Sequence, residues 1–181
     1  MDRFTNHIMP QVPGCPKSVI KAEVLRAGIE FCTNSFIWQI DEEHEVLDGA
    51  STITLSVTSG ASVTACQLSI DKQAFNEYTR SDETVTLDDA RTSDVTFQTT
   101  AFLKPTRAAT DLPDILYNDW SEAIESKAKA ELMLMPGRKW TNPQIAMINQ
   151  GKYRHGLGEA KIKARKTNNQ SQLMVRQRSF V

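Results

Sequence analysis

The chain has 181 residues and a net charge of −1, with 40% hydrophobic and 24% charged side chains. This composition is typical of globular proteins and excludes a wholly disordered chain. No apolar run approaches the roughly 18 residues that a membrane-spanning helix needs, and the first seven residues lack the apolar core of a secretory signal. Three widely spaced cysteines, Cys15, Cys32 and Cys66, favour a reducing compartment over a disulfide framework.

The charges are unevenly distributed along the chain. Residues 1–137 contain 11 Lys and Arg against 21 Asp and Glu, a net charge of −10. Residues 138–181 contain 10 basic residues and one acid, Glu159, a net charge of +9. This asymmetry indicates different partners for the two parts. The basic end could bind nucleic acid or an acidic protein surface, and that acidic surface could be the body of a second copy of the chain. The alternative is a solvated basic face on a terminal helix.

The first 36 residues divide into two parts. Residues 1–14 contain two prolines and a glycine without periodicity, which predicts an extended lead-in. Pro16 can open a helix at its first turn, and the apolar spacing that follows predicts a helix over residues 16–36. Gly28 lies inside it and indicates close helix packing. The apolar residues of the predicted face include Ile20, Val24, Ala27 and Phe31.

Residues 37–110 change to an alternation of polar and apolar residues, which is the period of half-buried strands. Strands are predicted at residues 51–58, 63–70, 84–87 and 95–103. Together they predict a small antiparallel sheet or sandwich of four to six strands. The acids between Asp41 and Asp48 are interpreted as a solvated loop, with a cation site as the less favoured alternative because hard cations need convergent ligands.

Two further helices are predicted after a linker that runs to Pro113. The first covers residues 114–135, with acids in its first turns and one apolar stripe. The second covers residues 142–166 and opens with a capping box that begins at Thr141. The predicted fold class is therefore α+β: a bundle of about three long helices, an inserted small antiparallel β domain at about residues 38–104, and an extended C-terminal arm.

Catalytic motifs are not recognisable in the sequence. The three histidines lie at no metal-ligand spacing with each other or with cysteine. Neither a phosphate-binding loop nor a nucleophile elbow occurs. Cys32 lies on the apolar helix stripe and is predicted to be a small core residue rather than a nucleophile. We therefore expect no cofactor, no metal site and no catalytic residue, and an enzyme lacks support.

Two stretches resemble the head-to-tail adaptor (connector) proteins of tailed bacteriophages. The first is residues 27–38, followed by an acidic region and Gly49, and the second covers residues 119–124 and 132–143. The order of a long helix, a β insertion, two helices and a C-terminal arm is also similar to that class. The resemblance implies one adaptor domain over residues 1–166.

The resemblance also implies a structural role in the virion. Adaptors of this class form a ring, commonly twelvefold, between the portal and the tail at the head-to-tail junction. The ring continues the channel for genomic DNA, which passes without sequence-specific binding. The expected partners are thus other copies of the chain, the portal protein and a tail or nozzle protein, with assembly in the host cytoplasm and no membrane.

Docking on the portal or on a neighbouring copy is assigned to the basic end and to the C-terminal arm, residues 167–181. The alternatives are a nucleic-acid-binding module that uses the basic end and another phage ring component such as a tail terminator. An arm that binds a partner on ordering would bury its apolar residues. The candidate docking residues are Lys161, Lys163, Arg165, Lys166, Leu173, Val175, Arg176, Arg178, Phe180 and Val181.

Overall fold

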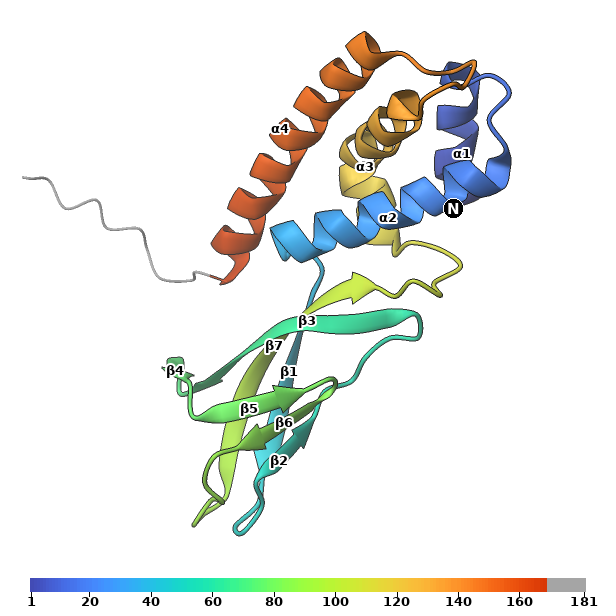
Figure 1. Ribbon diagram of the computed structural model, residues 1–181. Coiled ribbons are helices and arrows are strands. Elements are labelled where there is room, and N and C mark those ends of the chain that lie inside the picture. Colours follow the sequence, from blue (N-terminus) through green and yellow to red (C-terminus); the bar gives the residue numbers. More distant parts are fainter. Residues whose placement is uncertain (169–181) are drawn as a thin grey trace, which may run out of the picture.

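The computed structural model describes residues 1–168, which form a helical layer stacked on a β layer (Figure 1). The β layer is inserted between two helices of the helical layer: α2 precedes its first strand and α3 follows its last. The helices are α1 (Asp2–Ile8), a 3-10 turn η1 (Met9–Gln11), α2 (Lys17–Ser35), α3 (Asp114–Leu134) and α4 (Pro143–Asn168). The strands are β1 (Gln39–Val46), β2 (Thr52–Thr54), β3 (Ala61–Ile70), β4 (Gln73–Phe75), β5 (Tyr78–Ser81), β6 (Thr84–Leu87) and β7 (Val95–Pro105).

The predicted fold class, a bundle of about three long helices with a small inserted β domain, is wrong. Over residues 1–168 the fold is α+β with four α-helices and seven strands in two antiparallel sheets. The β layer has a hydrophobic core of its own, which contains Phe97, Val85 and Leu103. Because the β layer buries its own apolar surface, it is a full second layer of the fold and not a small addition to a helix bundle.

The predicted extended lead-in is also wrong. Its first half folds as α1, whose residues Phe4 and Ile8 are buried in the helical core. The ring of Phe4 contacts Tyr117 of α3 edge-on, with 5.2 Å between ring centroids. A helix this short has too little intrinsic stability to be recognised alone, so tertiary packing determines it.

The helix predicted at residues 16–36 is confirmed as α2. It ends where Phe36 adopts the left-handed conformation, with φ 56° and its N–H donating to the Cys32 carbonyl. Gly28 is closely packed, as predicted, but the side chain packed against it does not come from a helix. A Cβ at this position would lie 2.7 Å from the Leu112 side chain, which belongs to the segment before α3.

The two sheets have the strand orders β1-β7-β3-β4 and β2-β6-β5, and all their pairings are antiparallel. The predicted strands correspond to β2, β3, β6 and β7. The predicted count of four to six strands was too low, since β1, β4 and β5 were not predicted. β4 and β5 have three and four residues, which is too short for an alternating pattern. β1 is the segment that was interpreted as an acidic loop.

The helical layer is joined by an aromatic and polar network between α2, α3 and α4. Phe31 is fully buried and lies 5.6 Å from Trp120 and 6.3 Å from Tyr153, measured between ring centroids. The Tyr153 hydroxyl donates to Glu30 at 3.1 Å, and the Lys127 ammonium lies 3.1 Å from the same carboxylate. These contacts fix the rotation of α4 about its own axis, and thereby decide which residues it presents to solvent.

Alanine substitutions at two glycines of α4 are expected to have opposite effects on stability. A Cβ on Gly156 would lie 2.7 Å from Ala123 Cβ, which cannot move without α3, whereas a Cβ on Gly158 would meet nothing within 4 Å. We expect Gly156→Ala to lower the free energy of unfolding by about 1–2 kcal/mol through overpacking. Gly158→Ala should raise it by about 0.5–1 kcal/mol through helix propensity. Urea unfolding of both variants measures this, and equal effects of the same sign would contradict the packing described.

Stability is expected to fall at high pH because of Tyr153. Burial and the adjacent Glu30 carboxylate raise the pKa of Tyr153 above its ordinary value of 10.0. Below pH 10 both states of the chain keep the phenol proton, so stability is unaffected. Above pH 10 only the unfolded chain releases it, which lowers the free energy of unfolding by up to about 1.4 kcal/mol per pH unit. In urea unfolding between pH 9 and 11, Tyr153→Phe should show a shallower decline than the natural chain, and parallel declines would refute this origin.

Candidate functional site

The helix α4 begins at a side-chain cap that differs from the predicted one. Asn142, not Thr141, accepts the capping bond, from the Ile145 N–H to Oδ1 at 3.2 Å. The Thr141 hydroxyl instead donates to the Met135 carbonyl and accepts from the Arg138 N–H, closing the turn between α3 and α4. The predicted helix span of 142–166 is confirmed to within two residues.

The four predicted basic residues of α4 are all exposed, but they are not equivalent. Lys163 forms an ion pair of 2.7 Å with Asp119 of α3. Lys161, Arg165 and Lys166 form no ion pair within residues 1–168. Sequence reasoning missed Arg154, which is also exposed and also forms no ion pair within residues 1–168. Lys163 therefore contributes to the packing of α4 on α3, while the other cations are available to a partner.

Three of the free cations, Arg154, Lys161 and Arg165, lie along one line on α4, whereas Lys166 lies on another side of the helix. Residues separated alternately by four and three positions share one face of a helix. This line, which we call the outer stripe, consists of Met147, Gly151, Arg154, Gly158, Lys161 and Arg165. The buried side of α4, which includes Tyr153, Ala160 and Ala164, lies about 100° around the helix from the outer stripe.

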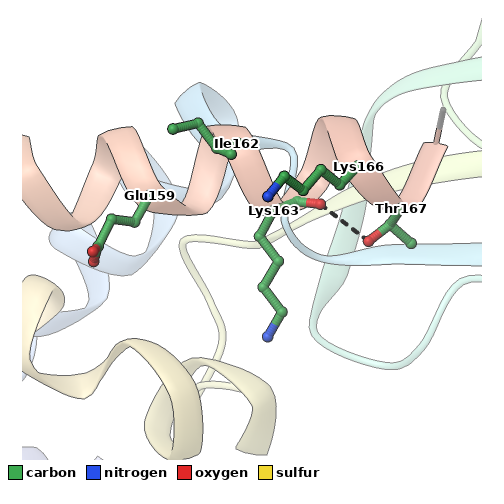
Figure 2. A pocket seen from close by; sticks show the side chains of 5 residues that line it. All are labelled: Glu159, Ile162, Lys163, Lys166 and Thr167. Atoms are coloured by element: carbon green, nitrogen blue, oxygen red, sulfur yellow. Dashed lines mark hydrogen bonds between the residues drawn. The ribbon is translucent and has the colours of Figure 1, made fainter. Parts of the chain in front are cut away.

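A shallow hollow of about 420 Å³ lies beside the outer stripe, near the end of α4 (Figure 2). The five side chains shown in Figure 2 all come from α4: Glu159, Ile162, Lys163, Lys166 and Thr167. Ile162 is 56% exposed, like the other isoleucines of α4, Ile145 at 43% and Ile148 at 63%. Among residues 1–168 a single helix lines the hollow, and this part of the chain supplies no opposing wall to enclose a small molecule. It suits contact with another macromolecular surface.

The opposite charge is presented by β1, an edge strand of the four-stranded sheet. Asp41, Glu43 and Glu45 alternate along it and are all exposed, and they form no ion pair within residues 1–168. The Thr100 hydroxyl donates to Asp41 at 2.6 Å, which orients that carboxylate without neutralising its charge. On the inner side Glu42 lies 3.1 Å from His44. The predicted acidic loop is thus a strand with a regular anionic face.

The histidines each contact one glutamate and no second metal-binding side chain. His7 lies 2.9 Å from Glu125, and His155 lies 3.8 Å from Glu159. Among the described residues no group of three or more His, Cys, Asp or Glu side chains is placed to hold a metal ion. The acids of β1 are spread along the strand and do not converge on a common centre. Because a hard cation needs converging oxygen ligands, this arrangement does not favour a cation site.

Cys32 lies in the helical core, as predicted, with no exposed surface. Burial raises the pKa of its thiol to about 12, so the thiol stays protonated near neutral pH and is a poor nucleophile. No helix within residues 1–168 is both long enough and apolar enough to cross a membrane.

Six of the predicted docking residues lie outside the described residues. They are Leu173, Val175, Arg176, Arg178, Phe180 and Val181. The remaining candidate surface thus consists of the outer stripe of α4 with its adjacent hollow, and of the acidic face of β1.

Comparisons with known proteins yield no relative that assigns a role. The chain matches no protein-family model, and it matches no curated protein. The functional conclusion therefore depends on the two charged surfaces and on the sequence resemblance.

Proposed function

We propose that the chain is a structural virion protein, a head-to-tail connector that forms a ring between portal and tail and continues the DNA channel. The observation that carries this proposal is the presence of two exposed surfaces of opposite charge on one subunit, the outer stripe of α4 and the acidic face of β1. A ring requires two different faces on each subunit, because its contacts run head to tail.

The shapes of the surfaces support a mechanical role over a catalytic one. In addition to the hollow on α4, the β layer has a second open hollow of about 660 Å³, where β3 begins and β5 turns into β6. Neither surrounds a cluster of nucleophile, base and orienting group of the kind that catalysis uses. Both are suited to contact over a broad area, as in a protein assembly.

Assembly measurements test the proposal directly. The purified full-length chain is studied by light scattering and negative-stain imaging, alone and mixed with rings of the portal protein encoded beside it. We expect closed rings or a stoichiometric complex with the portal. A chain that stays monomeric and ignores the portal would overturn the proposal. A related ring component such as a tail terminator would form rings without binding the portal, so the two mixtures separate these functions.

The C-terminal residues are expected to contribute to portal binding. A chain lacking residues 167–181 should keep its circular dichroism spectrum and its thermal transition, because the hydrophobic core lies within residues 1–164. It should lose at least tenfold in apparent affinity for the portal ring through loss of the arm's basic and apolar side chains. Co-sedimentation with portal rings measures this, and unchanged co-sedimentation of the truncated chain would refute a docking role for the arm.

A nucleic-acid-binding module is the second candidate, favoured by the free cations of the outer stripe. Binding through phosphate contacts would weaken steeply with salt. Tyr153 of α4 is buried, so among the rings of α4 only the exposed imidazole of His155 is open to stacking by a base. A DNA titration of the isolated chain at low and moderate salt tests this function, and tight binding that falls with salt would favour it over the connector.

A further inference from the structure

Two surfaces of opposite sign on this subunit have no ion-pair partner among residues 1–168. Arg154, Lys161 and Arg165 of the outer stripe are exposed and unpaired, and so are the acids on the outer face of β1. α4 belongs to the helical layer and β1 to the β layer (Figure 1), and no ion pair joins them within the described residues. Charges of this kind remain available to another molecule.

The two charged rows have similar overall lengths. Alternate residues of an antiparallel strand are about 6.8 Å apart, so Asp41 and Glu45 span about 14 Å. A helix rises 1.5 Å per residue, so Arg154 and Arg165 span about 16 Å along α4. Lys161 lies between them, as Glu43 lies between the two outer acids. Three cations therefore match three carboxylates over nearly the same length.

The glycines of the outer stripe indicate a close approach from outside. Gly151 and Gly158 lie seven residues apart on the exposed side of α4, and a Cβ on either would meet no atom within 4 Å. Glycine inside a helix lowers stability, and no contact with the described part of the chain requires it at these two positions. Gly156, by contrast, is required by Ala123 of α3. A partner backbone that lies against α4 would use the space that the two glycines leave open.

An exposed apolar residue lies next to each charged row. Ile162 is 56% exposed beside the outer stripe, and Leu47 is 58% exposed directly after β1. Exposed apolar residues beside charged rows are typical of a contact that combines hydrophobic burial with charge pairing.

We propose that the outer stripe of α4 docks on the outer face of β1 of a second copy of this chain, and that this is the contact which repeats around the ring. The inference rests on the proposed function and names the surfaces through which the ring forms. The occupant is a second copy because the chain itself carries a face of complementary charge and similar length. Since the two faces differ, each copy offers one free face to the next, and the contact continues until the ring closes.

The size of the contact predicts how assembly behaves. The exposed side of α4 is about 39 Å long and about 10 Å wide, an area of roughly 400 Å². A standard interface buries about 800 Å² on each partner. An isolated pair of subunits is therefore weak, and the closed ring, in which every subunit makes two such contacts, is the stable species. Assembly should weaken as salt is added, because the charged rows are exposed.

Charge reversal tests the contact. Glu43→Lys with Glu45→Lys reverses the β1 face, and Lys161→Glu with Arg165→Glu reverses the outer stripe. Each double variant should lose at least about 100-fold in its apparent association constant, since close charge pairs at interfaces couple strongly. Light scattering of the full-length chain across a concentration series measures the loss. Glu77→Lys with Glu83→Lys changes the net charge equally on other exposed acids, and this control should assemble like the natural chain.

Rescue by the complementary change makes the test specific. Mixing the two reversed variants, or placing all four reversals on one chain, restores opposite charges across the contact and should restore rings. A nucleic-acid site would not be rescued by reversing β1. If the natural chain assembles and both reversed variants assemble equally well, the contact is refuted while the connector function stands. If the natural chain forms no ring, with or without portal, both proposals are refuted.

A second pair of variants tests the close approach without changing charge. Gly151→Leu and Gly158→Leu each fill the open space on α4 and, having no neighbour within 4 Å, should leave the fold intact. Circular dichroism confirms the fold, and light scattering should show at least a tenfold loss of association. Undiminished assembly of both folded leucine variants would refute the docking of α4 through its outer stripe.

Discussion

Replacing Phe97 by alanine is expected to lower the free energy of unfolding by about 3–5 kcal/mol, the usual cost of removing a buried aromatic ring. Phe97 has no exposed surface and lies in the core of the β layer. Phe75 packs edge-on against its ring, with 5.3 Å between centroids, and the Arg91 guanidinium lies 5.5 Å from the ring centre. Loss of the ring removes the edge-on partner of Phe75 and one of the two rings that Arg91 contacts, and it leaves a cavity in the core of the β layer.

Urea unfolding measures this change, with Leu47→Ala as the matched control. Leu47 is 58% exposed, so its removal should change the free energy of unfolding by less than about 0.5 kcal/mol. Amide hydrogen exchange adds a second readout. Because the two layers have separate cores, β7 should lose protection in Phe97→Ala before α3 does. A loss of less than 1 kcal/mol, or equal loss of protection in both layers, would contradict the separation of the cores.

The long helices were predictable because their apolar residues repeat over many turns. α2, α3 and α4 each have at least 19 residues, so one misplaced residue does not obscure the period. The sequence of α1 has the same spacing, from Phe4 to Ile8, but over too few residues to stand out from chance. Its helix depends on burial against α2 and α3, which no local pattern records.

The strands were predictable only where one face is buried and the other polar. β1 violates that pattern, because its inner face carries Glu42 and His44 and its outer face carries acids. An edge strand tolerates such charges, which protect it from unwanted pairing. Arg80 shows a second limit of local patterns. Its guanidinium donates to the carbonyls of Val63 and Thr64 at a bulge in β3. These bonds join the two sheets through residues 16 and 17 positions apart in the sequence.

For the candidate site, the sequence indicated that α4 is basic but not which cations are free. Lys163 and Lys161 look alike in sequence, and only the position of Asp119 on the packed α3 distinguishes them. The outer stripe had a readable signal, the alternate spacing of four and three from Met147 to Arg165. The glycines obscured it, because their usual effect is to weaken a helix. Only the rotation of α4 in the folded chain shows that Gly151 and Gly158 have open space beside them.

Phe31→Ala is expected to have a comparable effect on the helical layer, a loss of about 3–5 kcal/mol. Phe31 is fully buried and its ring contacts Trp120 of α3 and Tyr153 of α4. Thermal unfolding followed by tryptophan fluorescence measures the loss, because Trp120 borders the cavity. Ile29→Ala, at a half-buried position of the same helix, is the control and should cost less than half as much. Equal losses would contradict the central position of Phe31.

The same substitution should also weaken assembly in a way that core destabilisation alone does not. Phe31 and the bond from Tyr153 to Glu30 fix the rotation of α4, so removing the ring allows the outer stripe to turn away from a partner. At a temperature where the Phe31→Ala chain remains folded, we expect its ring formation to need at least tenfold more protein than the natural chain. Ile20→Ala, at a fully buried position of α2 that belongs to neither proposed face, should assemble closer to the natural chain. If the two variants lose assembly in equal measure, stability rather than the orientation of α4 controls the ring.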